Sequence, residues 1–198
     1  DDSSSDTTTV SVSTDGVSPN SGPAVKHWVD ASVSITPDGL NEVGTSHDFI
    51  ITVTPSYPAG VSVTSVSITP TGNTGYISAE DCDEAGAGAA LSCTVTVNST
   101  SAGSAEIGAN VVVVFSDNSS SSTTSVPVST DAVSPNSGPA TKNWADGSVV
   151  IGDDDTNGIG EAHTFTIPVT PDYPSADTLD SVSITPPPHT SLLSLPPC

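Results

Sequence analysis

The stretch VSVSTDGVSPNSGPAVKHW (Val10–Trp28) returns as VPVSTDAVSPNSGPATKNW (Val126–Trp144), 116 residues further along the 198-residue chain. The same offset, without a gap, relates HDFIITVTPSYP (His47–Pro58) to HTFTIPVTPDYP (His163–Pro174). Over the 73 positions that align in this register, 39 are identical. A period of this length fits one domain per repeat and is too long for one turn of a solenoid, so the sequence predicts tandem domains.

The register also predicts the domain limits. Residues 1–15 match residues 117–131, which close the first repeat, so we interpret them as the closing strand of another unit or as a donor strand. The first domain is then expected over residues 16–130 and the second over residues 131–198. Because Cys198 aligns with Cys82, the second domain is expected to be truncated at its C-terminus, and the partner of Cys198 is expected beyond it.

Charge excludes several classes of function. The chain has 23 acidic residues and two basic ones, Lys26 and Lys142, which gives a formal net charge of −21. Nucleic-acid binding and binding to an anionic membrane surface both need clustered Lys and Arg, so neither partner is expected. The longest apolar run, Val111–Phe115, is far shorter than the roughly 20 residues of a membrane-spanning helix.

Short runs in which apolar and polar residues alternate recur along the first repeat. A period of two is typical of half-buried strands. The runs predict strands at residues 31–36, 47–54, 61–69, 76–78, 91–97, 106–115 and 123–130. Because these runs are separated by turns and nothing has helical periodicity, we expect an all-β fold: tandem immunoglobulin-like antiparallel β-sandwiches, the second incomplete at its C-terminus.

Finer features of the pattern predict local structure. The apolar phase slips between Val63 and Val66, which indicates a bulge. The continuous apolar end of residues 106–115 favours a central strand, and Pro127 favours an edge strand. His47, at the start of a strand, is expected to hydrogen-bond the backbone of the preceding turn.

Two cysteines suggest a disulfide. Cys82 and Cys93 flank a Gly-rich stretch, and we interpret them as a bridge that closes a small loop and contributes about 2–3 kcal/mol. Two unpaired buried thiols are the alternative. A disulfide predicts an oxidising setting, so the protein is expected to be extracellular, secreted or on a cell surface.

A motif that is shared by both repeats resembles that of a known family. The run KxWxDxSVxI, which begins at Lys26 and at Lys142, is followed in both repeats by a turn and H-[DT]-F-x-[IV]-x-V-T. It resembles the repeat units of secreted bacterial surface proteins with immunoglobulin-like domains. The resemblance implies an adhesin, a stalk or a fibre subunit. It implies no catalytic chemistry, and an enzyme is not expected.

The first functional hypothesis is a structural subunit of an extracellular fibre or filament whose partners are copies of itself. In a stronger version, residues 6–14 complete the sheet of a neighbouring subunit by strand donation. One alternative is an adhesin or carbohydrate-binding array, which needs exposed aromatic residues grouped on loops. Trp28 and Trp144 are instead expected to cap the core or to pack at the domain joint. The other alternative is an accessory segment of a large secreted enzyme.

An acidic turn suggests the one candidate cofactor, calcium. In GDDDTNGIGEAH (Gly152–His163), oxygen-bearing side chains alternate as they do in calcium-binding loops. The candidate ligands are Asp153, Asp155, Asn157 and Glu161. Thr164 stands where such a loop would carry its bidentate Glu, and the first repeat lacks the acidic residues. A solvated Asp-rich turn is therefore the alternative.

Asn98 and Asn118 each begin an N-x-[ST] triplet and are candidate glycosylation sites, so glycans are candidate partners. An unmodified polar segment is the alternative.

Lys26 is a candidate for a self-formed isopeptide bond with Asn110, promoted by Glu106. The alternative is an exposed Lys that pairs with one of many acids, a contact worth less than roughly 1 kcal/mol.

Overall fold

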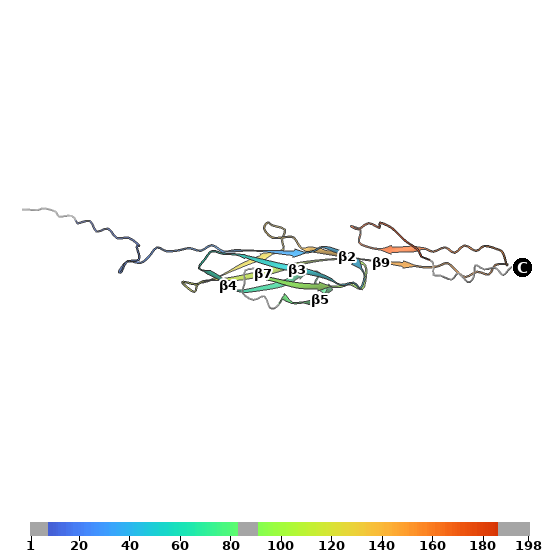
Figure 1. Cartoon of the computed structure of the whole chain (residues 1–198), viewed down its shortest axis with the longest axis horizontal. Helices are drawn as coiled ribbons and strands as arrows, with labels where there is room; N and C mark the ends of the chain where they lie inside the picture. Colours follow the sequence, from blue (N-terminus) through green and yellow to red (C-terminus); the bar gives the residue numbers. More distant parts are fainter. Residues whose placement is uncertain (1–7, 83–90, 186–198) are drawn as a thin grey trace, which may run out of the picture.

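Nearly all the regular secondary structure is β-strand in a computed structural model that describes residues 8–82 and 91–185 (Figure 1). Within that part, the only helix is the single 3-10 turn η1 (Thr74–Tyr76), and no helix is long and apolar enough to cross a membrane. The strands are β1 (Asp30–Thr36), β2 (Gly39–Glu42), β3 (His47–Ser56), β4 (Val61–Gly72), β5 (Ile77–Glu80), β6 (Leu91–Val97), β7 (Gly103–Asp117), β8 (Thr123–Ser129), β9 (Ala140–Val149) and β10 (Val169–Asp172).

Two sheets form a sandwich. The first, sheet A, has the order β1-β3-β6-β5, and all its neighbours are antiparallel. In the second, sheet B, β7 is central: β4 pairs along one side of it, while β8 and the start of β9 follow one another along the other side. Strand β2 lies outside β9 and pairs with it in parallel. The predicted all-β class and the predicted central position of residues 106–115 are confirmed, whereas the parallel pairing of β2 with β9 departs from the predicted antiparallel sandwich.

The core lies between the two sheets and is built from their alternating inward residues. Along β1 and β3 the register places Val33 opposite Val53 and Ile35 opposite Ile51, and all four side chains are buried. From the facing sheet, β7 contributes a run of buried side chains that ends at Phe115. Each fully buried Val, Ile or Phe stabilises the fold by about 1.5–3 kcal/mol before entropy is counted, so this alternation is what holds the sheets together.

Other local predictions are also confirmed. The ladder between β4 and β7 shifts register between Val63 and Ser65, where the apolar phase slips in the sequence. Pro127 lies in β8, which pairs only with β7 and is therefore an edge strand. The Nε2 atom of His47 lies 2.9 Å from the carbonyl oxygen of Pro37, in the turn before its strand.

The first sandwich runs past the boundary at residue 130 that the repeat register predicts. Residues 140–145 of β9 pair with β7 and β2 and therefore belong to sheet B, although they are part of the second sequence repeat. The sandwich begins at Asp30, so its limits are displaced toward the C-terminus from the predicted range of 16–130. The physical reason is that a repeat in the sequence can begin anywhere within the structural unit, because the period alone does not mark which strand is first.

The second repeat begins to fold as the first one does. The pairing of Val149 with Val169, between β9 and β10, reproduces the pairing of Val33 with Val53 one repeat earlier. Backbone hydrogen bonds from Val150 and Gly152 continue this ladder beyond the strand ends. Apolar side chains that match the core of the first sandwich here line an open groove of about 600 Å³: Val149, Ile151, Phe165, Ile167, Val169, Val182 and Ile184.

Candidate functional site: the strand that joins the repeats

Strand β9 belongs to two ladders at once. Its first half lies between β7 and β2, with Trp144 opposite Gly103 on one side and Asn41 on the other. Its second half, Asp146–Val149, pairs with β10 in the second repeat. The two repeats are therefore joined by one continuous strand without a separate linker, and Figure 1 shows the chain passing from the sandwich into the second repeat along β9.

Trp144 anchors this strand in the first sandwich. Its side chain is 0% exposed, and its indole N–H donates a hydrogen bond to the carbonyl oxygen of Thr45 at 3.1 Å. The ring stacks on Tyr76 with centroids 5.3 Å apart. Burying a large aromatic ring whose polar N–H is satisfied is among the most stabilising contacts that one side chain can make.

Lys142 is the second inward residue of the strand and is also fully buried. Its Nζ donates a hydrogen bond to the carbonyl oxygen of Asn143 at 2.7 Å and lies 5.3 Å from the centre of the Trp144 ring. Burial lowers the pKa of Lys142 below its ordinary value of 10.5, because the charged form loses hydration, and the carboxylate of Asp177 opposes that change.

Asp177 connects this site to the second repeat. Its Oδ1 accepts a hydrogen bond from the Asn143 side-chain amide at 3.0 Å. Its Oδ2 is buried and has no hydrogen-bond partner within the described residues. A half-buried carboxylate of the second repeat thus faces the strand that carries the buried cation of the first sandwich, and both repeats contribute to one polar joint.

The elbow Asp131–Pro139, which precedes β9, covers the free edge of β1. The Oδ1 of Asn136 accepts a hydrogen bond from the Val33 amide at 3.1 Å, and the Ser137 hydroxyl accepts one from the Ile35 amide at 3.0 Å. Asp131 holds the elbow by accepting hydrogen bonds from the amides of its own turn, chiefly that of Val133, and these lower the pKa of Asp131. An edge strand with free N–H groups is a site for unwanted pairing, and the elbow blocks it.

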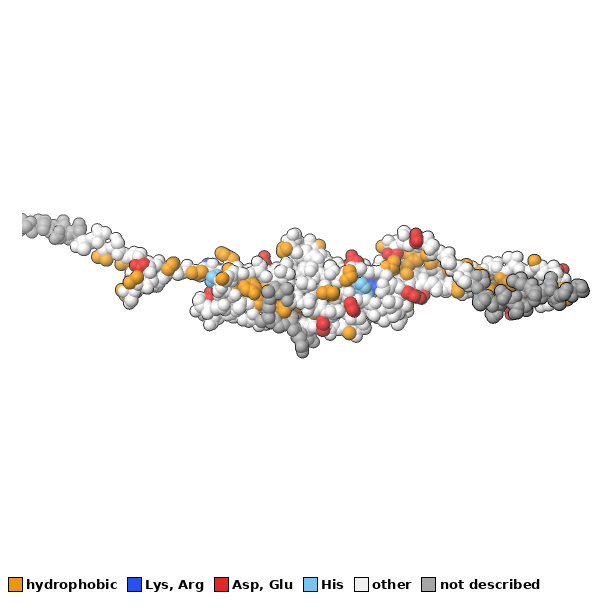
Figure 2. Space-filling model, viewed as in Figure 1, with side chains coloured by type: hydrophobic (Ala, Val, Ile, Leu, Met, Phe, Trp, Pro, Cys, Tyr) orange, Lys and Arg blue, Asp and Glu red, His pale blue; other side chains and the backbone are white. Residues whose placement is uncertain are grey.

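Residues 15–23 of the first repeat, which match residues 131–139, form the same elbow but lie in a different environment. Asp15 accepts hydrogen bonds from the Val17 amide at 3.1 Å and from the Asn20 side chain at 3.2 Å, and its pKa is lowered in the same way. Yet Trp28, the counterpart of Trp144, is 81% exposed. Figure 2 shows this N-terminal segment extended from the end of the sandwich, with apolar side chains at its surface.

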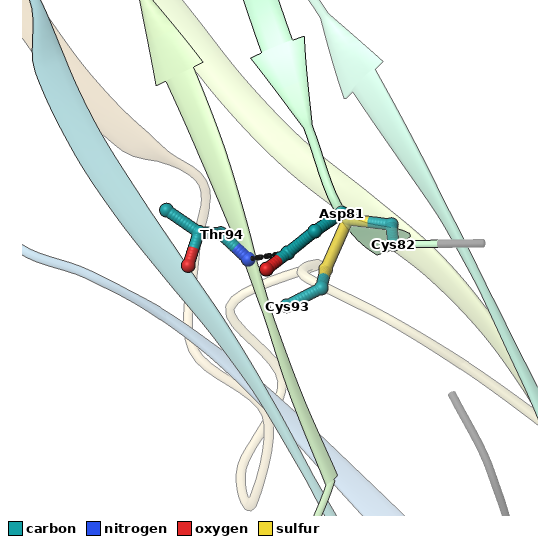
Figure 3. The surroundings of a disulfide bond; sticks show 4 residues. All are labelled: Asp81, Cys82, Cys93 and Thr94. Atoms are coloured by element: carbon teal, nitrogen blue, oxygen red, sulfur yellow. Dashed lines mark hydrogen bonds between the residues drawn. A yellow bond between two sulfur atoms is a disulfide. The ribbon is translucent and has the colours of Figure 1, made fainter. Parts of the chain in front are cut away.

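The predicted disulfide is present. Cys82, directly after β5, is bonded to Cys93 of β6, and both residues are buried (Figure 3). Beside the bond, the amide of Thr94 donates a hydrogen bond to the Asp81 carboxylate. Asp81, Cys82 and Cys93 form the only group of three or more potential metal-ligand side chains in the described part of the chain. Since both sulfurs are bonded to each other, this group offers no thiolate to a metal.

The structure does not gather the predicted calcium ligands. Asp155 lies 3.3 Å from a ring nitrogen of His163, and the Glu161 carboxylate accepts a hydrogen bond from the Gly158 amide. The side-chain amide of Asn157 donates to the carbonyl oxygen of Ala162. These side chains complete a solvated turn among themselves, and calcium binding stays a prediction.

The proposed isopeptide residues lie apart. Lys26 is exposed before β1 and lines a small hollow with Asp117, at the end of β7. Asn110 and Glu106 are exposed further back along β7, and at about 3.3 Å per residue Asn110 is roughly 23 Å from Asp117. Within one domain the structure therefore does not bring this triad together.

The two predicted glycosylation sites differ in access. Asn118 is exposed at the end of β7, where its side chain accepts a hydrogen bond from Ser62. Asn98 is half-buried, and its side chain contacts Gly44 and the Ser99 amide. Glycosylation stays a prediction, and Asn118 is the more accessible site.

Searches of protein-family models, of curated proteins and of solved structures find no match to this chain.

Proposed function

We propose that this chain is a structural subunit of an extracellular fibre or filament, built as a tandem array of immunoglobulin-like sandwiches that share their connecting strands. The observation that carries the proposal is β9, which is hydrogen-bonded into sheet B of one sandwich and, further along, into the next repeat. In this proposal the protein acts by forming the array, which requires no catalytic group.

A connection of this kind is stiff. Bending between two domains that are joined by a Gly/Ser-rich linker costs little, because such a linker is a flexible coil. Bending at β9 would break ladder hydrogen bonds on both sides of the strand and would move Trp144 out of its pocket. The ten residues of β9 span about 33 Å, which is long enough to hold two successive repeats in line.

Two chemical features suit an extracellular location. The Cys82–Cys93 bond persists in an oxidising environment and would be reduced in most cytosols. The net charge of −21 keeps such arrays soluble through mutual repulsion.

The adhesin alternative receives less support. It needs aromatic side chains presented together to a ligand, and Trp144 is fully buried with Tyr76 stacked on it. Trp28 is exposed, but it repeats the position of Trp144 and is better explained as a packing residue.

Electron imaging of the native material from which the chain derives tests the proposal. Straight filaments with a regular axial repeat are expected. The matched control is a recombinant array of several repeats with Gly-Gly inserted between Ala145 and Asp146, which interrupts the shared strand and should make the array flexible. Flexible strings of beads from the uninterrupted array would contradict the proposal.

A further inference from the structure

Resting on the proposed function, we propose that Ala24–Val29 is a docking strand for the sandwich domain that precedes it in the same chain. It would lie between that domain's β7-like and β2-like strands and close its sheet, with Trp28 in its core. The partner is thus a domain of this repeat type, and the elbow before the strand docks with it.

The first support is the residue pattern. In β9, the side chains that point into the first sandwich are Ala140, Lys142 and Trp144, and all three are buried. The aligned residues in the first repeat are identical: Ala24, Lys26 and Trp28. The three differences fall at the intervening positions, which face away from the core and are half-buried in β9: Val25 for Thr141, His27 for Asn143 and Val29 for Ala145. The segment Ala24–Val29 therefore carries the same three side chains that β9 directs into the first sandwich.

The second support is the elbow, which is already folded. The Gly16 amide donates to the carbonyl oxygen of Ser21 at 3.1 Å, as the Ala132 amide does to that of Ser137 at 3.0 Å. In the second repeat, this geometry aims Asn136 and Ser137 at the edge of β1. The matching Asn20 oxygen and Ser21 hydroxyl make no hydrogen bond within the described residues, so they are free to bind an equivalent edge.

The third support is exposure. Val25 and Trp28 are 73% and 81% exposed, and the Lys26 ammonium lies 5.4 Å from the centre of the Trp28 ring, the arrangement that Lys142 and Trp144 have when buried. The pair thus already has its docked geometry. The groove that β9 fills in the first sandwich shows what such an exposed apolar segment can bind, namely the equivalent groove of another domain of this repeat type.

A lengthened chain provides the test. Residues 16–130 are fused directly before Asp15, which keeps the 116-residue register and places Ala24–Val29 where β9 would follow in the added domain. Trp28→Ala is then made in both the original and the lengthened chain, and unfolding of each domain is followed by calorimetry. Val25→Thr is the matched control, because Val25 is exposed and Thr occupies the aligned position 141.

The expected result is that Trp28→Ala leaves the original chain unchanged and lowers the folding equilibrium constant of the added domain by about 10²–10³-fold. Val25→Thr should be nearly silent in both. If Trp28→Ala is silent in the lengthened chain, or if the added domain does not fold, the docking strand is wrong. If the original chain instead dimerises in a Trp28-dependent manner, the partner is a second copy, and the assignment to a preceding domain is overturned.

The two proposals can fail separately. Lengthened chains that remain straight in electron images while Trp28→Ala is silent would refute the docking strand alone. Lengthened chains that are sensitive to Trp28→Ala but flexible would refute the stiff fibre alone.

Discussion

Trp144 stacks on Tyr76 with ring centroids 5.3 Å apart, although Trp144 belongs to the second sequence repeat and Tyr76 to the first. This contact means that the first sandwich is incomplete without residues from the following repeat. The folding of the first sandwich therefore depends on residues 140–145, which belong to the following sequence repeat.

The two tryptophans provide a matched pair for a stability test in this chain. Trp144→Ala should destabilise the first sandwich by about 3–5 kcal/mol, because it leaves a large cavity beside Tyr76. Trp28→Ala should change the free energy of unfolding by less than about 0.5 kcal/mol, because its side chain is exposed. Urea unfolding measures both, and equal effects would refute the assignment of Trp144 to the core.

The buried Lys142 predicts a dependence of stability on pH. Its folded pKa lies below 10.5, so the unfolded chain binds more protons between the folded and unfolded values. The free energy of unfolding should therefore rise with pH across that window, as the penalty for burying the ammonium is relieved. Lys142→Met should remove this rise, and at pH 7 it should match the wild type or exceed it by up to about 4 kcal/mol.

Lys26→Met is the control for that experiment, because Lys26 is exposed and its removal changes the formal charge equally. Urea midpoints are compared at pH 7 and at pH values approaching 10.5. If the wild type and Lys142→Met respond to pH in parallel, the lysine is not buried as described.

The disulfide should stabilise the edge of sheet A. Replacing Cys82 and Cys93 together with Ala should lower the free energy of unfolding by about 3 kcal/mol, mainly because the unfolded chain gains freedom. A reductant should reproduce the loss in the wild type and have no effect on the double variant. Cys198→Ser is the control and should keep the sensitivity to reductant; an insensitive wild type would show that the bond is absent.

A close backbone approach at the end of β4 predicts a requirement for glycine. Gly72 has φ of +87°, and a Cβ atom there would lie 2.3 Å from the carbonyl oxygen of Glu106. Gly72→Ala should therefore destabilise the sandwich by more than about 1 kcal/mol. Gly75→Ala, whose Cβ would meet nothing within 4 Å, should stay within about 0.5 kcal/mol of the wild type in the same thermal unfolding measurement.

Much of the first sandwich could be predicted from the sequence because its inward residues are apolar at every second position. The strands over residues 31–36, 47–54 and 91–97 are found close to their predicted limits. The disulfide could be predicted as well, because its two cysteines are close in sequence and surround a Gly-rich stretch.

Strand β9 could not be predicted in the same way. Its inward residues are Ala140, Lys142 and Trp144, and a lysine at an inward position breaks the apolar alternation that marks a strand. Its partner β2 contains Gly39 and lies in a segment that reads as a turn. The signal that was available is the alternation Ala-x-Lys-x-Trp in both repeats, together with the fact that the two lysines are the only basic residues.

Amide hydrogen exchange along β9 tests the central claim most directly, since residues 142–144 are paired on both sides, with β7 and with β2. We predict that their amides exchange as slowly as those of β7 and lose protection only when the whole sandwich unfolds. Exchange of these amides at the rate of an exposed linker, while β7 stays protected, would show that the second repeat does not close the first, and would contradict the shared strand on which the account depends.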